Sequence, residues 1–161
     1  MKNLVVYYSR SGNTETVAQE ISKLVDGDVF KIELVKPIGF GWVGFTALAG
    51  LRGKIKPLTV NIKAYDNIFI GSPVWAGKSS TPVNTFLHET DFTGKNVFAF
   101  ITQADFKTPG SVYESIAKRV EGNGGKVIDT FFIKTDMKNP LTPEQAKEAV
   151  SKWTDSIHYD K

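Results

Sequence analysis

Segments with strand-like and helix-like hydrophobic patterns alternate along the whole chain, and this alternation constrains the fold more than any other feature. The continuous apolar run at residues 4–8 is typical of a strand buried on both faces. Residues 14–25 follow with apolar side chains at helical spacing. The same patterns predict strands at 29–35, 67–71, 97–101 and 127–133, and helices starting at Thr81-Pro82, covering 109–120, and starting at the capping box Thr142-Pro143-Glu144-Gln145.

Five strands that alternate with helices predict a parallel sheet with right-handed crossovers. We therefore expect an α/β fold, a doubly wound five-stranded parallel sheet in the order 2-1-3-4-5 with helices on both faces. The 161 residues are enough for one hydrophobic core, and no repeat or linker divides them, so we expect a single domain over residues 1–161. Only the stretch from Pro37 to Pro57, rich in glycine and aromatic residues, departs from the pattern.

The composition excludes several kinds of chemistry. The chain contains no cysteine, which excludes thiol catalysis and cysteine-ligated metal centres. Its carboxylates are scattered, and both histidines, His88 and His158, lie in expected helices, so we expect no metal site. No nucleic-acid motif is present, and no uncharged apolar run reaches the roughly 18 residues of a membrane helix. We therefore expect no nucleic-acid partner, no stable membrane insertion and, without a signal-peptide pattern, a cytoplasmic location.

Positive charge is concentrated in one part of the chain. Between Lys31 and Lys63 there are six cationic residues and one acid, Glu33, which gives this segment a net charge of +5 within a chain of net charge +3. One interpretation is an ordinary solvated face. The other is a docking face for an acidic partner or an anionic substrate.

In an open α/β sheet, ligands bind beyond the carboxyl ends of the strands, where the strand order reverses. The first strand is followed by Ser9-Arg10-Ser11-Gly12-Asn13-Thr14, which leads directly into a helix. The amino terminus of a helix can bind a phosphate through its backbone N–H groups, and Gly12 lets the backbone approach closely. The segment matches neither a Walker loop nor GxGxxG. The alternative is that Ser11 or Asn13 only caps the helix.

Two further polar segments follow predicted strands. The third strand leads into Gly71-Ser72-Pro73-Val74-Trp75-Ala76-Gly77-Lys78, a predicted loop in which the Trp75 ring is placed to stack on a flat ligand. The alternative is that Trp75 closes the top of the core. Residues 102–110 follow the fourth strand and contain small and polar side chains that suit hydrogen bonding to the edge of a heterocycle. The alternative is that they form an ordinary connecting loop. In the expected strand order these three segments meet, which predicts a site for a mononucleotide with a large flat base.

The sequence resembles the flavodoxin family, in its short-chain form, over essentially the whole chain. Residues 8–14 resemble the family's phosphate loop, residues 65–75 its third strand and first flavin loop, and residues 93–97 its entry to the fourth strand. The resemblance implies non-covalently bound FMN. It implies a phosphate site at Ser9, Arg10, Ser11, Gly12, Asn13 and Thr14, an isoalloxazine contact at Pro73, Val74, Trp75, Ala76 and Gly77, and a third set at Thr102, Gln103 and Asp105.

The resemblance also implies a function: an FMN-binding electron-transfer protein that shuttles electrons between redox partner proteins. The basic segment suggests that these partners are acidic. The alternative on the same fold is an NAD(P)H-dependent flavin or quinone reductase. For that alternative, Phe40, Trp42 and Phe45 are candidates for a substrate lid or a dimer contact, although the same residues also fit a helix packed on the sheet.

Overall fold

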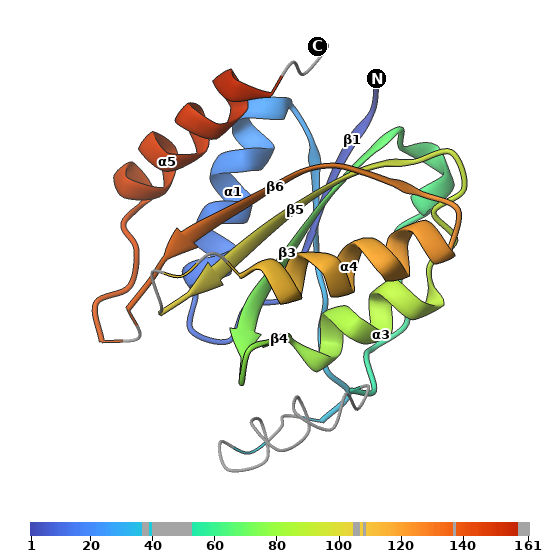
Figure 1. Ribbon diagram of the computed structural model, residues 1–161, viewed down its shortest axis with the longest axis horizontal. Coiled ribbons are helices and arrows are strands. Elements are labelled where there is room, and N and C mark those ends of the chain that lie inside the picture. The colour runs from blue at the N-terminus through green and yellow to red at the C-terminus, as the bar shows by residue number, and fades with distance from the viewer. Residues whose placement is uncertain (37–38, 40–52, 105–106, 108, 137, 158–161) are drawn as a thin grey trace.

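The computed structural model describes residues 1–36, 39, 53–104, 107, 109–136 and 138–157 (Figure 1). Its parallel sheet has the order β2-β1-β3-β5-β6, which confirms the predicted doubly wound α/β fold and strand order. A sixth, two-residue strand pairs antiparallel with the end of β3. The strands are β1 (Asn3–Tyr7), β2 (Asp28–Lys31), β3 (Asn67–Trp75), β4 (Lys78–Ser79), β5 (Asn96–Gln103) and β6 (Lys126–Lys134).

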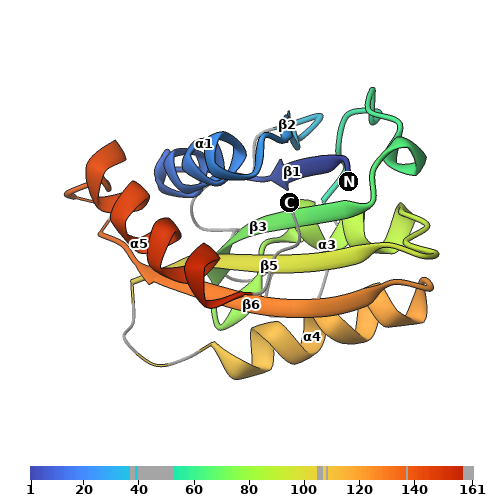
Figure 2. The same ribbon diagram turned by 90° about the horizontal axis from the view of Figure 1, so that it is seen from above.

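Helices cover both faces of the sheet (Figure 2). Alternate residues of a strand point to opposite faces, so the buried strands feed two apolar clusters. Leu4 and Val6 of β1 pack in the cluster that contains residues of α3 (Thr81–Glu89) and α4 (Gly110–Gly122). Val5 and Tyr7 pack in the cluster that contains residues of α1 (Asn13–Val25) and α5 (Pro143–Ser156). A short 3-10 helix, η1 (Ile62–Ala64), precedes β3.

The predicted helix starts are reproduced closely. The Thr142 side chain accepts a hydrogen bond from the Gln145 backbone, and the Gln145 side chain accepts one from the Thr142 backbone, which confirms the capping box. The start of α3 is shifted by one residue, because Ser80 occupies the N-cap position and Thr81 is the first helical residue. His88 is exposed on α3, as predicted, whereas His158 lies outside the described residues.

The second strand is shorter than predicted. We expected it to continue to Val35, but β2 ends at Lys31 because its neighbour β1 ends opposite, at Tyr7. The chain then pairs with a later segment: Leu34 forms an antiparallel bridge with Ile55, and the backbone N–H of Val35 donates to the carbonyl of Lys54. The aromatic residues on which we based the lid and the packed helix, Phe40, Trp42 and Phe45, lie outside the described residues.

The third strand is longer than predicted. We expected a loop after Gly71, but β3 continues to Trp75, and Pro73 is paired with Thr102 of β5. Proline has no backbone N–H to donate, so it is tolerated where a strand lacks a neighbour on one side. Here β1 ends at Tyr7, opposite Gly71, so β3 beyond Gly71 no longer pairs with β1. Trp75 is therefore a strand residue, which corrects the loop interpretation.

Within the described part of the chain, no helix is both long and apolar enough to cross a membrane.

Candidate functional site

The loop between β1 and α1 presents the start of a helix that has no side-chain cap. Gly12 occupies the N-cap position with φ +91°, a left-handed conformation that glycine adopts at little cost. The first hydrogen bond of the helix runs from the Thr16 N–H to the Gly12 carbonyl, at 2.9 Å. The Ser9 hydroxyl accepts the Gly12 N–H at 3.1 Å. The alternative that Ser11 or Asn13 caps α1 is therefore wrong, and the N–H groups of its first turn have no acceptor within the helix.

Two buried side chains hold this loop against distant segments. The Asn13 side-chain carbonyl accepts the Leu141 backbone N–H at 2.8 Å, and its amide donates to the Asp136 carbonyl at 3.3 Å. The hydroxyls of Thr14 and Thr102 form a buried hydrogen bond of 2.7 Å. The phosphate loop is thereby fixed both to the β6–α5 connection and to β5.

The Trp75 side chain is largely covered and lies at the edge of a cavity. It is 7% exposed, its ring meets the Tyr8 ring edge-on at 5.5 Å, and the Arg10 guanidinium lies over it at 6.0 Å. Among the described residues, Trp75 is a member of neither apolar cluster of the core. It lines the same cavity as Arg10 and Ser11. The indole at the end of β3 therefore contacts Tyr8 and Arg10, at the start of the loop between β1 and α1.

β3 returns to β4 through a two-residue turn. Val74 pairs with Ser79 and Trp75 with Lys78, so Ala76 and Gly77 form the turn. Both have positive φ, +48° and +74°, as in a type I′ turn. Alanine pays a steric cost in this region, so the turn carries backbone strain beside the cavity.

The base of the β3–β4 hairpin is fixed by hydrogen bonds. The Ser72 hydroxyl accepts the Ser80 backbone N–H at 2.9 Å and is 3.1 Å from the Ser80 hydroxyl. The Ser79 hydroxyl donates to the Asn84 side-chain carbonyl at 2.6 Å, and the Asn84 amide donates back to the Ser79 carbonyl. These bonds tie the hairpin to the start of α3 and leave its exposed tip, Ala76 and Gly77, projecting beyond them.

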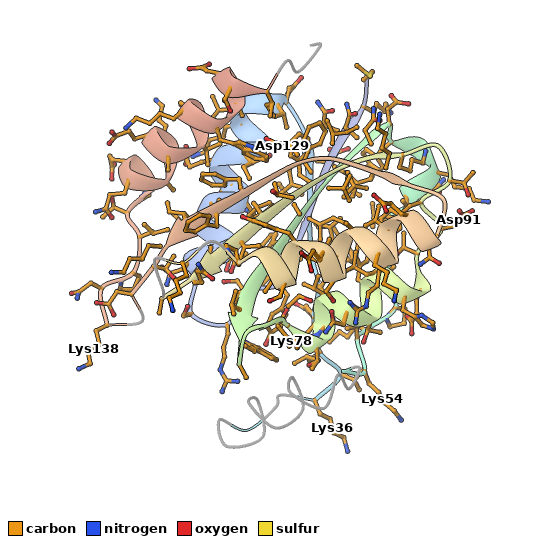
Figure 3. The ribbon with its side chains drawn as sticks, in the orientation of Figure 1. Lys36, Lys54, Lys78, Asp91, Asp129 and Lys138 are labelled. Atoms are coloured by element: carbon orange, nitrogen blue, oxygen red, sulfur yellow. The ribbon has the colours of Figure 1, made fainter. Side chains whose placement is uncertain are left out.

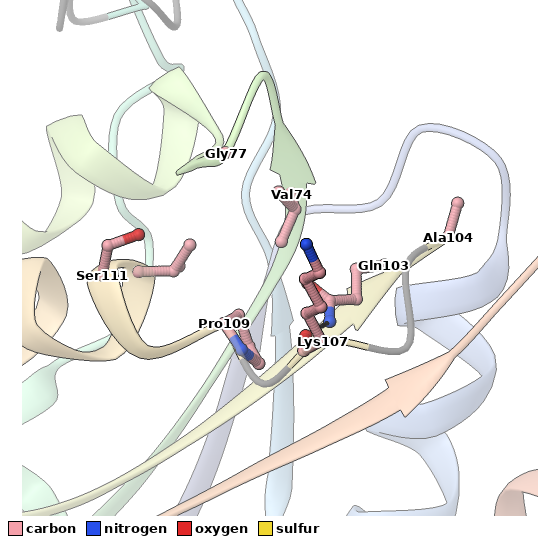
Figure 4. A pocket seen from close by; sticks show the side chains of 8 residues that line it. Val74, Gly77, Gln103, Ala104, Lys107, Pro109 and Ser111 are labelled. Carbon is pink, nitrogen blue, oxygen red and sulfur yellow. Dashed lines mark hydrogen bonds between the residues drawn. The ribbon is translucent and has the colours of Figure 1, made fainter.

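Two adjoining cavities lie where the three segments meet. The smaller, about 130 Å³, lies beside the phosphate loop, and the larger, about 350 Å³, lies between the hairpin and the start of α4 (Figure 4). Val74, Gln103 and Ala104 line both. The described residues that complete the smaller cavity are Arg10, Ser11, Asn13, Pro73, Trp75, Thr102 and Thr135, and those that complete the larger one are Gly77, Lys107, Pro109, Ser111 and Val112.

The third predicted segment is held in place through Gln103. Its side-chain amide donates to the Lys107 carbonyl, and its backbone carbonyl accepts the Thr135 N–H at 2.7 Å. Thr102 and Gln103 are both buried. Asp105, which we also predicted for this site, lies outside the described residues.

The structure thus gathers nine of the fourteen predicted site residues on the walls of the two cavities: Arg10, Ser11, Asn13, Pro73, Val74, Trp75, Gly77, Thr102 and Gln103. Ser9, Gly12, Thr14 and Ala76 lie in the same loops. Sequence reasoning missed Thr135, Ser111 and Val112, which line the cavities but lie outside the predicted site segments. Lys107 and Pro109 lie within the predicted segment 102–110 but were not singled out as site residues.

The described ionisable groups that line the cavities, Arg10 and Lys107, are positively charged. Burial raises the pKa of Tyr8, and the nearby charge of Arg10 partly opposes this. Deeper in the fold, the Tyr7 hydroxyl donates to Glu15, and a hydrogen bond from Lys31 to Glu15 lowers the pKa of that carboxyl. Hydroxyls, unbonded helix N–H groups and a guanidinium together form a donor set suited to an anion.

Comparison with known proteins places this geometry among flavoproteins. A Bacteroides eggerthii protein assigned as a flavoprotein superposes with a TM-score of 0.80 at 23% identity, over 99% of each chain. A Lactobacillus acidophilus flavoprotein crystallised in complex with FMN gives 0.67 at 24% identity, over 95% of this chain and 98% of that one. Oxidised Flavodoxin 2 from Bacillus cereus gives 0.60 at 21% identity, over 98% and 100%. These three superpositions show that the chain shares the fold of these proteins.

The comparison with curated proteins gave no match. The family model for flavodoxin matches residues 48–156, which is more than half of the chain. This match begins after the phosphate loop, so the β1–α1 geometry described above is an observation independent of it. The resemblance recognised in the sequence is confirmed, and the chain belongs to the flavodoxin family.

Proposed function

We propose that this protein binds FMN in the two adjoining cavities and carries electrons between redox proteins. FMN is the cofactor of the flavodoxin family, and one structural neighbour was crystallised with it. The observation that carries the proposal is the meeting of three segments around one crevice, with hydroxyls, helix N–H groups and the Trp75 indole at one end and the β3–β4 turn, β5 and the start of α4 at the other. The size, polarity and position of this crevice fit a flavin mononucleotide.

At the phosphate end, the backbone is the main donor. The Asn13 and Thr14 side chains are already bonded within the protein, so their role is to hold the loop in shape. The N–H groups of the first turn of α1 and the hydroxyls of Ser9 and Ser11 are placed to donate to a phosphate. Arg10 adds positive charge to the same cavity.

At the ring end, the walls are apolar on the hairpin side and polar on the β5 side. Val74 and Gly77 lie on one side of the larger cavity, and Gln103 lies on the other (Figure 4). Trp75 lines the smaller cavity together with Arg10 and Ser11. When bound there, FMN supplies the reversible uptake of electrons, and the protein supplies orientation and the surrounding charge.

Membership in the flavodoxin family supports electron transfer as the role of the bound cofactor. The positive groups at the crevice, Arg10 and Lys107, favour the more negatively charged, reduced state of a bound flavin. The alternative on the same fold, an NAD(P)H-dependent flavin or quinone reductase, had Phe40, Trp42 and Phe45 as candidates for a substrate lid or a dimer contact, and these residues lie outside the described residues.

Binding is tested by titrating the flavin-free protein with FMN and following flavin fluorescence and visible absorbance. We expect one FMN per chain, with a flavin spectrum that is released on denaturation. Phosphate-free riboflavin is the matched control ligand, and we expect it to bind much more weakly because it lacks the group held by α1. Equal affinity for FMN and riboflavin would contradict the phosphate site.

The electron-transfer role is tested by stopped-flow mixing of the FMN-loaded protein with two reductants. We expect fast reduction by a chemically reduced ferredoxin and no direct reduction by NADPH or NADH. Fast reduction by either nicotinamide would instead assign the reductase activity.

A further inference from the structure

Four exposed lysines gather along the edge of the sheet at which the crevice opens. Lys36, Lys54, Lys78 and Lys138 lie along the lower edge of the view in Figure 3, toward which β3, β5 and β6 run. Among the described residues, the salt bridges are formed by other lysines, Lys23, Lys31, Lys56 and Lys152. Together we call Lys36, Lys54, Lys78 and Lys138 the lysine rim.

Nearby carboxylates offset only part of this charge. Glu33 and Glu15 are occupied by Lys56 and Lys31. Asp136 accepts the Lys138 backbone N–H at 2.8 Å, which lowers the pKa of its carboxyl, and among the described residues no salt bridge joins it to the Lys138 ammonium. Exposed Glu114 and Glu144 lie in the early turns of α4 and α5. Against these stand the four rim lysines and the two cations that line the cavities, Arg10 and Lys107.

The rim differs from the basic segment that the sequence suggested. Within residues 31–63, Lys31 and Lys56 are paired with acids. Lys63 lies near Asp91, whose pKa is lowered mainly by hydrogen bonds from Thr93 and to a smaller extent by the charges of Lys63 and Lys95. Asp91 lies at the side of the molecule away from the rim (Figure 3). Lys78 and Lys138, in contrast, come from outside that segment and join Lys36 and Lys54 only in the folded chain.

We propose that the lysine rim docks the acidic face of a redox partner protein over the mouth of the crevice, an inference that rests on the proposed electron-transfer function. The rim draws on four separate segments: the chain after β2, the chain beside Ile55, β4 and the β6–α5 connection. A surface this broad is suited to a protein face, whereas one small anion contacts only a part of it. Unpaired charges around a crevice steer an oppositely charged partner and give a transient, salt-sensitive complex.

The docking surface is tested with an acidic plant-type [2Fe–2S] ferredoxin as the probe. The rim variant carries Lys36→Gln, Lys54→Gln and Lys138→Gln. Lys78 is left in place because it follows Gly77 of the β3–β4 hairpin, which lines the proposed FMN site. The control variant carries Lys2→Gln, Lys118→Gln and Lys126→Gln, which are exposed, take no part in the salt bridges of the described residues and remove the same charge. FMN content and thermal unfolding are measured first for both.

Binding of the oxidised ferredoxin to the ¹⁵N-labelled, FMN-loaded protein is followed by NMR at low and high salt. We expect the rim variant to bind about tenfold more weakly than the parent at low salt, the control variant to change less than about twofold, and added salt to weaken the parent. An equal loss of ferredoxin affinity in the rim variant and the control variant would mean that binding depends on net charge alone, and it would overturn the proposal. Tight binding of NADPH to the rim, lost in the rim variant, would assign a small anion instead.

Electron transfer separates this proposal from the function on which it rests. One electron leaves the reduced ferredoxin cluster, which becomes oxidised, and enters the flavin. Rim-dependent binding without this transfer would contradict the carrier function and leave the docking surface standing. Transfer at the same rate in the rim and control variants would contradict the docking surface and leave the carrier function standing.

Discussion

The phosphate loop and the tip of the β3–β4 hairpin face the same crevice, but the protein holds them in different ways. The loop is bonded through Asn13 to the β6–α5 connection and through Thr14 to β5. Among the described residues, the side-chain hydrogen bonds of the hairpin lie at its base, at Ser72 and Ser79. Its tip, Ala76 and Gly77, adopts left-handed backbone conformations and is exposed.

This difference suggests that the two ends of the crevice have different roles: a fixed end for the phosphate and an adjustable end for the ring. A phosphate needs donors at fixed positions, and a loop tied to two distant segments loses little conformational freedom when it binds one. The flavin ring changes charge when it is reduced, so its binding benefits from a neighbouring backbone segment that can change conformation. The strained turn at Ala76 supplies such a neighbour, because little energy is needed to move a backbone already held outside its preferred region. Substitutions at the two ends should therefore have different effects.

The largest effect is expected at Gly12. The substitution Gly12→Val places a β-branched residue at φ +91°, although no other atom lies within 4 Å of the new Cβ position. We expect a loss of about 2–3 kcal/mol in the free energy of unfolding from backbone strain. FMN affinity should fall by at least about a hundredfold, because the helix N–H groups move. Urea unfolding and FMN titration measure the two effects.

The control for this prediction is Gly122→Val, at the end of α4. Gly122 has equally open space around its Cβ position but no positive φ. A Gly122→Val protein that loses as much stability as Gly12→Val would show that the left-handed backbone is not the cause.

The parts of this architecture that the sequence predicted are those that depend on local pattern. Alternating apolar runs located the five parallel strands, and helical spacing located α1, α4 and α5. The capping box at Thr142 and Gln145 was readable because both partners lie within four residues. The glycine and hydroxyls of residues 9–14 marked the loop between β1 and α1 for the same reason, and its binding of a phosphate stays a prediction.

The parts that failed depend on neighbours distant in sequence. Proline at 73 indicated the end of a strand, yet β3 continues past it because β1 has ended and β5 has not. The Ala76-Gly77 pair lacks the Asn-Gly signal of a type I′ turn, so the hairpin was not foreseen, and the burial of Trp75 was expected only under the alternative that it closes the top of the core. The roles of Asn13 and Thr14 depend on partners far along the chain: Asn13 bonds to Leu141, 128 residues away, and Thr14 to Thr102, 88 residues away.

The second-largest effect is expected at Asn13, which tests whether the phosphate end is fixed by its cross-bonds. Asn13→Ala removes the acceptor of the Leu141 N–H and the donor to the Asp136 carbonyl. We expect a loss of about 1–3 kcal/mol in the free energy of unfolding. FMN affinity should fall about tenfold as the loop becomes mobile. Chemical denaturation and FMN titration report on these effects.

Two further variants sharpen the Asn13 result. Asn13→Asp keeps the acceptor for Leu141, so it should retain part of the stability while its charge repels the phosphate. Asn139→Ala removes an exposed side chain that donates a hydrogen bond to the nearby Asp136, and it should change neither quantity appreciably. If Asn139→Ala matched Asn13→Ala in stability, the cross-bonds of Asn13 would not be what fixes the loop.

The smallest effect, and the only gain, is expected at the hairpin tip. Ala76→Asn places at φ +48° a residue that tolerates the left-handed region better than alanine does, and Asn-Gly is the preferred type I′ pair. We expect the free energy of unfolding to rise by about 0.5–1 kcal/mol. Ala64→Asn, exposed in η1 at an ordinary backbone position, should give no such gain. FMN affinity should stay within about twofold, because the phosphate end supplies the fixed contacts. A stabilised hairpin that also bound FMN tenfold more weakly would show that the ring end needs its strain for binding itself, and the division between a fixed end and an adjustable end would have to be redrawn.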